Sequence, residues 1–253
     1  SRRRLAGLWQ RMVTPPVIVT RAEPGASETV ERLRAMGLTA ISSPMLELKS
    51  LDLPMPDLSD IYHLVFTSAN GVRYFVEAVG GISEQIADLT AWCVGPATTH
   101  AAKAAGFQRI MAGDGNADEL SDLILSADGV EGGFLHVANS AAAGNLVAQL
   151  TAAGREARFL ALYETVPASG FDEDAKAALV SEAATIILFH SAKAAEAFSA
   201  LSEDLPMITN VAVAISEAAA APLRSLNARA MIAAARPNEN ALMEALLQAC
   251  KGL

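Results

Sequence analysis

The sequence has little of several features that mark common functional classes. Its 253 residues include two cysteines and only 5% aromatic side chains, and the net charge is −9 at neutral pH. Cys93 and Cys250 have no metal-ligand spacing and are expected to be buried or inert thiols. The lack of a basic face argues against nucleic-acid binding, and no apolar run approaches the roughly 18 residues of a membrane span. These absences predict a soluble, cytoplasmic protein.

Motifs for cofactors, metals and covalent catalysis are also missing. There is no G-x-G-x-x-G, no P-loop and no nucleophile elbow, and the four histidines lack metal-ligand spacing. His63 and His136 fall in or beside predicted strands, which favours a structural role, whereas His190 falls in a predicted loop. We therefore predict no cofactor and no metal. A catalyst of this kind would work by shaping and orienting its substrate.

The first twelve residues differ from the rest of the chain. Ser1-Arg2-Arg3-Arg4, with Leu5, Leu8 and Trp9, is basic and weakly amphipathic but has no apolar signal core. We interpret residues 1–12 as an N-terminal extension or a cloning remnant, with a native start at Met12.

What the sequence does contain is an internal repeat in three segments. The pairs are Val17–Thr20 with Phe134–Val137, Leu64–Ala69 with Ile187–Ala192, and Trp92–Gly95 with Val213–Ser216. Equivalent positions in and after these segments lie 117, 123 and 121 residues apart. A nearly constant offset over half the chain indicates two similar lobes rather than an array of short repeats. Two facing lobes would form a cleft, where a ligand is expected.

Each repeated segment predicts the same local structure. A run of four or five apolar residues is followed by small polar residues and then by about twelve residues with helical periodicity. Short buried strands that alternate with helices predict parallel sheets covered on both faces. Right-handed crossovers then give two doubly wound α/β lobes joined by extended connector strands.

The order of the segments predicts where the chain passes between the lobes. An extended stretch with a proline, at Pro44 and Pro167, follows the first segment of each half. We expect lobe 1 to hold residues 13–43 and 168–253, and lobe 2 to hold residues 48–162. The connectors would be residues 44–47 and 163–167, running parallel or antiparallel. The alternative is two contiguous lobes divided near Asp128-Gly129.

Small polar residues follow the predicted strands, at the edge where parallel sheets bind ligands. Free N–H groups and the helix dipole at this edge suit a ligand that carries several carboxylates. Taken singly, each residue is most simply a helix N-cap, but their recurrence at equivalent junctions predicts a binding rim. The candidates are Arg21, Ser68, Asn70, Thr98, Asn139, Ser140, Ser191 and Ser216.

From Val17 to about Leu247 the chain resembles the uroporphyrinogen-III synthase family. The motifs are Val19-Thr20-Arg21, Gly37 with Pro44-Met45-Leu46-Glu47, Phe66-Thr67-Ser68-Ala69-Asn70-Gly71-Val72, Val94-Gly95-Pro96-Ala97-Thr98, Tyr163-Glu164-Thr165, Phe189-His190-Ser191 and Arg236-Pro237. No single motif is decisive, but their order and spacing together are specific. The resemblance implies two α/β lobes linked by a pair of extended strands.

The resemblance also implies a reaction. The family closes hydroxymethylbilane, a linear tetrapyrrole with eight carboxylates, to uroporphyrinogen III with its last ring inverted. The route runs through an azafulvene and a spiro intermediate and belongs to tetrapyrrole (haem) biosynthesis. The chain would then be a cyclising hydro-lyase, a monomer, and a transient partner of the upstream hydroxymethylbilane synthase.

Site residues are implied on the same basis. Tyr163 would assist departure of the substrate hydroxyl, the alternative being a tyrosine that packs between the lobes. Propionates and acetates would bind at Arg21, Thr67, Ser68, Ala69, Asn70, Thr98, Asn139, Ser191 and Ser216. The second half departs from the family pattern, since Glu217 places a negative charge near a proposed anion site. A binding or regulatory module that kept the fold without catalysis is therefore the alternative function.

Overall fold

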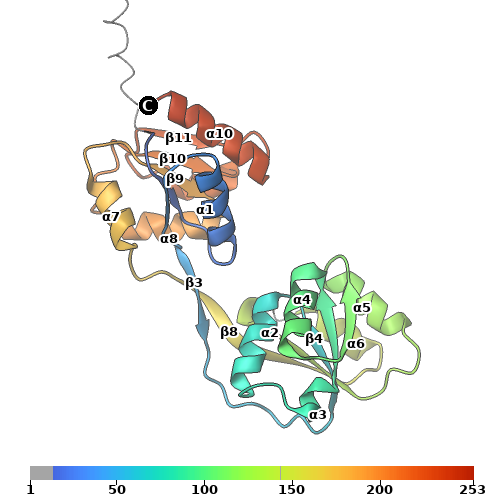
Figure 1. Cartoon of the computed structure of the whole chain (residues 1–253). Helices are drawn as coiled ribbons and strands as arrows, with labels where there is room; N and C mark the ends of the chain where they lie inside the picture. The colour runs from blue at the N-terminus through green and yellow to red at the C-terminus, as the bar shows by residue number, and fades with distance from the viewer. Residues whose placement is uncertain (1–13, 143) are drawn as a thin grey trace, which may run out of the picture. The chain divides into compact units, whose positions relative to one another are not determined.

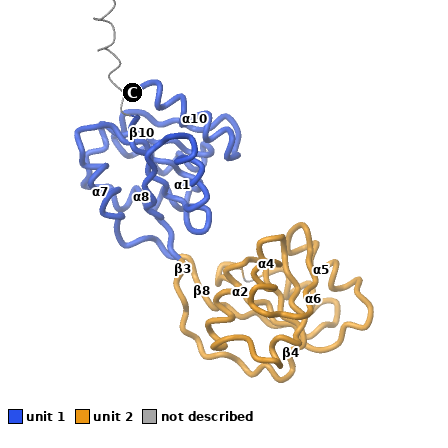
Figure 2. Tube along the Cα trace, viewed as in Figure 1, with its two compact units in different colours: residues 1–47, 166–253 blue, residues 48–165 orange. Residues whose placement is uncertain are grey.

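A computed structural model of the chain describes residues 14–142 and 144–253. Residues 1–12, interpreted above as an extension with a start at Met12, lie outside the described residues. The chain forms two compact units (Figures 1 and 2). Unit 1 combines residues up to Glu47 with Val166–Leu253, and unit 2 is Leu48–Thr165. A division near Asp128-Gly129 is wrong, because that turn lies inside unit 2.

Unit 1 contains a five-stranded sheet of order β11-β10-β9-β1-β2, in which the recorded pairings are parallel. Its elements are β1 (Val17–Val19), α1 (Gly25–Ala35), β2 (Ala40–Ser42), α7 (Glu173–Val180), β9 (Ile186–Phe189), α8 (Ala192–Leu201), β10 (Val211–Ala214), α9 (Glu217–Ala220), η2 (Ala221–Leu223), β11 (Ala230–Ala233) and α10 (Glu239–Lys251).

Unit 2 is built on a six-stranded sheet of order β3-β8-β7-β4-β5-β6, with parallel pairings from β8 to β6. Its elements are β4 (Ile61–Phe66), α2 (Ala69–Ala78), α3 (Glu84–Ala87), β5 (Thr90–Val94), α4 (Gly95–Ala105), β6 (Arg109–Gly113), α5 (Ala117–Ser126), β7 (Gly133–Asn139), η1 (Ser140–Ala142) and α6 (Asn145–Ala152).

Strands β3 (Leu46–Ser50) and β8 (Ala157–Pro167) carry the chain between the units. The amide of Leu51 donates to the carbonyl of Leu162, and the amide of Ala168 donates to the carbonyl of Met45. Because the residue numbers rise along one segment and fall along the other, the two segments run antiparallel. Residues 163–167, expected as a separate connector, are the second half of the eleven-residue strand β8.

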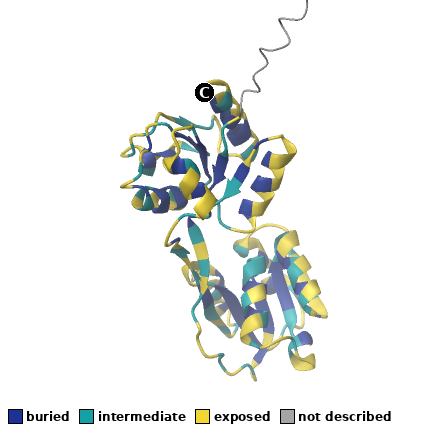
Figure 3. Ribbon diagram, turned by 60° about the vertical axis from the view of Figure 1, so that its left-hand side comes forward, coloured by how far each residue is buried: buried dark blue, intermediate teal, exposed yellow. Residues whose placement is uncertain are grey.

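Helices cover both faces of each sheet, because the central strands are apolar on both sides. In unit 1, Val17 and Val19 pack with α1 and α10, and Ile18 packs with α8 on the opposite face. In unit 2, Val65 faces the layer of α5 and α6, while its neighbours face α2 and α4. Figure 3 shows the buried strands in dark blue, with exposed residues on the outer sides of the helices. The α/β class with parallel-dominated sheets, predicted from the sequence, is confirmed by this architecture.

Two glycines fix how close the unit 2 helices lie to their sheet. A Cβ at Gly71 would lie 2.8 Å from the carbonyl oxygen of Val137, so α2 can approach β7 only with glycine there. Gly95 has φ +81° and opens α4 directly after β5, and Pro96 supports the first turn. The helix therefore begins three residues before Thr98. Thr98 is buried within α4 and does not cap it, in contrast to the N-cap interpretation.

Candidate functional site

Each sheet has one point where the strand order reverses. In unit 1 this point lies between β1 and β9, and in unit 2 between β4 and β7. Open α/β sheets bind ligands beyond the carboxyl ends of the strands at such a point. We call Thr20–Pro24 with His190-Ser191 the rim of unit 1, and Thr67–Asn70 with Asn139-Ser140 the rim of unit 2. The rims hold most of the candidates, whereas Thr98 and Ser216 follow strands β5 and β10, away from the reversal.

The rim of unit 2 brings together Ser68 and Tyr163, which are 95 residues apart in the sequence. Ser68 is the N-cap of α2, and its Oγ accepts a hydrogen bond from the amide of Gly71 at 3.3 Å. The same Oγ lies 2.9 Å from the Oη of Tyr163 on β8. Ser68 therefore has more than a local capping role, because it connects α2 to Tyr163 on β8, the strand beyond β7.

Tyr163 is held firmly in this position. Its side chain is buried, and its ring stacks on Tyr74 of α2 with centroids 4.5 Å apart and an interplanar angle of 11°. Burial raises the pKa of the Tyr163 phenol, while the contacts from Ser68 and from the backbone of Asn139 act to lower it. At neutral pH the phenol therefore keeps its proton and can donate a hydrogen bond.

Thr67 and Asn139 complete the rim of unit 2. Thr67 Oγ1 lies 3.1 Å from His136 Nε2, and His136 is buried on β7. Burial lowers the pKa of His136 to about 4, so the ring is neutral at physiological pH. Asn139, expected in a loop, is the last residue of β7, where its Nδ2 donates to Thr165 Oγ1 at 2.8 Å and its Oδ1 accepts from the amide of Ala141. Neutral hydrogen-bonding groups dominate this rim.

The rim of unit 1 has the same cap but a different chemistry. Ser191 Oγ accepts from the amide of Ala194 at 3.1 Å, so Ser191 caps α8 as Ser68 caps α2. His190 stands where unit 2 has Thr67, and its Nε2 lies 2.8 Å from a carboxylate oxygen of Glu239 on α10. Burial lowers the pKa of His190, although Glu239 opposes the shift. Its Nδ1 is buried without a partner among the described residues.

Arg21 belongs to this ionic group. Its Nη1 lies 3.5 Å from Thr29 Oγ1, which in turn lies 3.5 Å from Glu239. A Cβ at Gly25 would clash with the Arg21 side chain, which therefore packs against the first turn of α1. Arg21 is a partly buried cation beside the His190–Glu239 pair.

The other candidates differ in how well they fit a rim. Ala69 and Asn70 form the first turn of α2 and are partly exposed, so their amides lie at the positive end of a ten-residue helix. Ser216 caps α9 through the amide of Ala219, but α9 has four residues and its Glu217 pairs with Arg224. Ser140 lies in η1 and is exposed. Among these, the start of α2 is the best placed for an anion.

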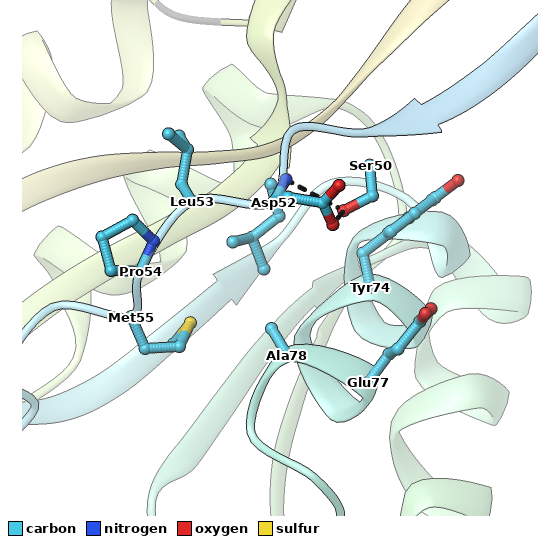
Figure 4. A pocket seen from close by; sticks show the side chains of 9 residues that line it. Ser50, Asp52, Leu53, Pro54, Met55, Tyr74, Glu77 and Ala78 are labelled. Atoms are coloured by element: carbon cyan, nitrogen blue, oxygen red, sulfur yellow. Dashed lines mark hydrogen bonds between the residues drawn. The ribbon is translucent and has the colours of Figure 1, made fainter.

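A pocket of about 460 Å³ lies against Tyr74, beside the tyrosine pair of unit 2. Figure 4 shows Tyr74 and Glu77 extending from α2 on one side and the segment from Asp52 to Met55 on the other. Asp52 and Glu77 make this pocket acidic, so it is a poor place for a carboxylate. Tyr74 therefore contacts the acidic pocket and also stacks on Tyr163, whose hydroxyl contacts Ser68.

His63 has a structural role at the opposite end of the unit 2 sheet. Its Nδ1 accepts from the indole N–H of Trp92 at 3.1 Å, so its Nε2 carries the proton and donates to the carbonyl of Glu131 at 2.9 Å. A pocket of about 610 Å³ lies here, at the amino ends of β4 and β5. Both ring nitrogens are occupied, which leaves His63 without a free group for chemistry.

Comparison with known proteins identifies the chain. The family model described as uroporphyrinogen-III synthase HemD matches residues 27–244. This chain belongs to the uroporphyrinogen-III synthase family. A search of curated proteins gives no match. The family predicted from the sequence is confirmed.

A solved structure has a similar fold. A uroporphyrinogen-III synthetase from Helicobacter pylori is 16% identical with a TM-score of 0.61, and the alignment covers 93% of this chain and 100% of that one. Two forms of uroporphyrinogen III synthase from Thermus thermophilus also match. The mutant form is 18% identical (95% and 100% coverage, TM-score 0.46), and the wild type is 19% identical (94% and 97%, TM-score 0.41).

Within this family fold, sequence reasoning missed residues that surround the rim of unit 2. Tyr74 and Arg73 were not predicted, and Thr165 was noted only within the Tyr163-Glu164-Thr165 motif. His136, predicted to be structural, is buried on β7. Arg73 is exposed on α2, and its guanidinium carbon lies 5.1 Å from the centroid of the Tyr74 ring. The sequence offered a signal, because Arg73 and Tyr74 lie about one and a half helical turns after the Ser68 cap.

No described helix is long and apolar enough to cross a membrane. Within residues 14–142 and 144–253, no group of three histidine, cysteine or acidic side chains could hold a metal ion.

Proposed function

We propose that this chain closes hydroxymethylbilane to uroporphyrinogen III with inversion of the terminal ring, using Tyr163 at the rim of unit 2. Family membership supports the substrate class. The observation that carries the role of Tyr163 is its 2.9 Å contact with Ser68, which joins a buried phenol on β8 to the N-cap at the point where the strand order reverses. A buried tyrosine hydroxyl needs a hydrogen-bond partner in any role, so what distinguishes Tyr163 is that its partner is the N-cap of α2.

The proposed reaction begins with departure of the substrate hydroxyl. The C–O bond breaks, the leaving oxygen takes a proton to become water, and an azafulvene cation remains. The substituted carbon of the terminal pyrrole attacks this cation to form a spiro intermediate. That intermediate fragments and recloses in the opposite sense, and the new ring junction loses a proton. Atoms balance with one water released, and proton loss at the end balances proton uptake at the start.

Tyr163 fits the first step as a hydrogen-bond donor. Because burial raises the pKa of its phenol, complete transfer of the proton would be costly. A hydrogen bond to the departing oxygen stabilises charge as it develops, without forming a phenolate. The intermediates are intrinsically reactive, so the larger task of the protein is to hold the two end rings in the inverting geometry.

The carboxylates of the substrate would bind mainly to local donors. With a net charge of −9 the whole chain repels a polyanion, so binding must come from nearby groups. The amides at the start of α2 and α8, the side chains of Thr67 and Asn139, and the cation of Arg21 are such groups. Each charge-assisted hydrogen bond contributes about 1.5–3 kcal/mol.

Further parts of the proposal rest on the sequence resemblance. The chain would be a cyclising hydro-lyase that acts as a cytoplasmic monomer and receives its substrate from hydroxymethylbilane synthase in a transient contact. Sedimentation of the purified chain, alone and with the upstream enzyme, tests the monomeric state and the partner.

The deciding experiment supplies enzymatically generated hydroxymethylbilane and measures type III and type I products at early times. An active chain yields the type III isomer, and a binding module yields only the type I isomer of spontaneous closure. Tyr163→Phe should slow type III formation by about 10- to 100-fold, at or below the low end of general acid catalysis, while the protein stays folded. Full activity in this variant would reduce Tyr163 to a packing residue.

The ratio of type III to type I product shows in which step of the reaction Tyr163 acts. An unchanged ratio of isomers at saturation with slower turnover would place Tyr163 in hydroxyl departure. A larger share of type I would place it in positioning the terminal ring.

A further inference from the structure

Ser68 has more hydrogen-bonding capacity than an N-cap requires. A serine hydroxyl offers one donor and two acceptor lone pairs. One lone pair accepts from the amide of Gly71, and the same oxygen lies 2.9 Å from Tyr163 Oη. Only one proton can lie between these two oxygens, so the direction of this hydrogen bond decides where the other proton points.

Either direction leaves one hydroxyl proton without a recorded partner among the described residues. If Tyr163 donated to Ser68, the Ser68 proton would be left over, and Tyr163 is its single side-chain neighbour among the recorded contacts of the described residues. If Ser68 donates, a continuous chain runs from the Gly71 amide through Ser68 to the phenol oxygen. The Tyr163 proton then has no recorded partner among the described residues, which leaves it available to an oxygen of the substrate. Hydrogen bonds in such a chain polarise one another, and the positive end of α2 acts in the same sense.

We propose that Ser68 is a positioning residue that donates to Tyr163 and thereby aims the phenol proton at the departing hydroxyl of the substrate. This inference rests on the proposed role of Tyr163. Ser68 acts through Tyr163 and does not itself touch the reacting atoms. Its counterpart Ser191 makes the same cap bond in unit 1, with no recorded side-chain partner among the described residues.

The test is a double-mutant cycle with Ser68→Ala and Tyr163→Phe, measured as the rate of type III formation at saturating substrate. Loss of one hydrogen bond should slow the wild-type background about 2- to 12-fold. In the Tyr163→Phe background the same change should cost less than about twofold, because the group that Ser68 orients is gone. Equal slowing in both backgrounds would overturn the proposal and leave Ser68 as a cap.

Ser68→Asp gives a second, independent measurement. Aspartate is a good N-cap but has no proton to donate at neutral pH, and it would draw the Tyr163 proton toward itself. The proposal expects kcat no higher than in Ser68→Ala, although the helix is better capped. Recovery of kcat in Ser68→Asp would contradict it. Any repulsion of the substrate carboxylates would appear in KM.

Ser83→Ala is the matched control. Ser83 caps α3 in the same unit through the amide of Ile86 at 3.2 Å and lies in neither rim. It should leave the rate within about twofold, and a loss like that of Ser68→Ala would overturn the proposal by making cap loss alone sufficient. The failures are distinguishable: a wild-type chain without type III product refutes the proposed function, and full activity in Tyr163→Phe refutes the role of Tyr163. An additive cycle refutes the role of Ser68 alone.

Discussion

Ser68 and Ser191 occupy equivalent positions in the two units, and their surroundings differ. Both cap a ten-residue helix through the amide three residues on. Ser68 also contacts Tyr163, and its neighbour Thr67 contacts neutral His136. The neighbour of Ser191 is His190, which pairs with Glu239. The same strand-to-helix junction thus carries a serine–tyrosine hydroxyl pair in unit 2 and a histidine–carboxylate hydrogen bond in unit 1.

We propose from this comparison that the chemistry belongs to unit 2. A junction supplies the helix amides whatever its sequence, so both units can hold an anion. Catalysis needs a proton donor placed by a second element, and among the described rims the one in unit 2 has this arrangement through β8. The changes below test this division of labour, from the largest expected effect to the smallest.

The largest effect should be the acid sensitivity of unit 2. Burial lowers the pKa of His136 from about 6.5 in the unfolded chain to about 4. The folded state prefers the neutral ring, so this stabilisation is present above about pH 6.5 and is lost as the pH falls toward 4. At pH 5 the loss reaches up to about 2 kcal/mol.

Urea unfolding at pH 7 and pH 5 measures this difference. His136→Asn should unfold with a smaller loss of free energy between the two pH values than the wild type. His190→Asn should change the loss less, because Glu239 offsets part of the burial effect. If both variants reduced the loss of unfolding free energy between pH 7 and pH 5 by the same amount, the predicted difference between the two units would be contradicted.

The next effect concerns the helix amides. Ala69→Pro and Ala192→Pro each delete one amide at the first position of α2 or α8, where proline is tolerated. The preceding serines are extended, with φ/ψ of −152°/156° and −156°/155°, as a residue before proline requires. If unit 2 holds the reacting end of the substrate, Ala69→Pro should weaken binding of uroporphyrinogen III about tenfold, or about 1.4 kcal/mol. Ala192→Pro should weaken it less than about threefold.

Anaerobic titration with the product gives both dissociation constants. Glu84→Pro at the start of α3 is the matched control, since Ser83 is an extended N-cap outside either rim. Stronger weakening by Ala192→Pro than by Ala69→Pro would reverse the assignment of the two rims.

The sequence contained enough to predict the class of fold and the capped junctions. Short apolar runs and the serine N-caps at Ser68 and Ser191 depend only on residues that are near one another in the sequence. They can therefore be recognised without the structure. The partners were not local: Thr67 meets His136 and His190 meets Glu239 across 69 and 49 residues. These contacts depend on which strands and helices are neighbours, which the repeat alone does not specify.

Thr98 shows why one junction was misjudged. The first repeat suggested a polar loop of four residues after β5, by analogy with Thr67–Asn70. Gly95 instead adopts φ +81° and turns the chain at once, so the helix starts there. A threonine three residues into a helix packs inward rather than capping it. Conformational freedom at a single glycine therefore removed the expected cap at Thr98, which follows β5, away from the strand reversal.

A smaller effect is expected for the hydrogen bond between His190 and Glu239 in unit 1. Glu239→Gln keeps a hydrogen-bonding side chain but removes the charge beside His190, and should lower the free energy of unfolding by about 1 kcal/mol. The His190 and Glu239 side chains are 8% and 30% exposed, whereas the Arg224–Glu217 pair is 60% and 76% exposed. Glu217→Gln should therefore change stability by less than about 0.5 kcal/mol. Chemical denaturation of both variants at pH 7 checks the contrast, and equal losses would contradict it.

The smallest effect is expected for Ser216→Ala. Ser216 caps α9 through a 3.1 Å contact with the amide of Ala219, in the same manner as Ser68 and Ser191. A helix of four residues has only a weak dipole, and Glu217 in its first turn adds a negative charge. Ser216 also follows β10, one strand away from the reversal between β1 and β9. Removing its hydroxyl should leave type III formation within about twofold of wild type and cost about 0.5–1 kcal/mol in stability. A loss of activity as large as that of Ser68→Ala, in a variant that still melts near the wild-type temperature, would show that substrate contacts extend beyond the rims at the two strand reversals. The division between a hydroxyl pair in unit 2 and a histidine–carboxylate hydrogen bond in unit 1 would then be incomplete, because a third junction would also contact the substrate.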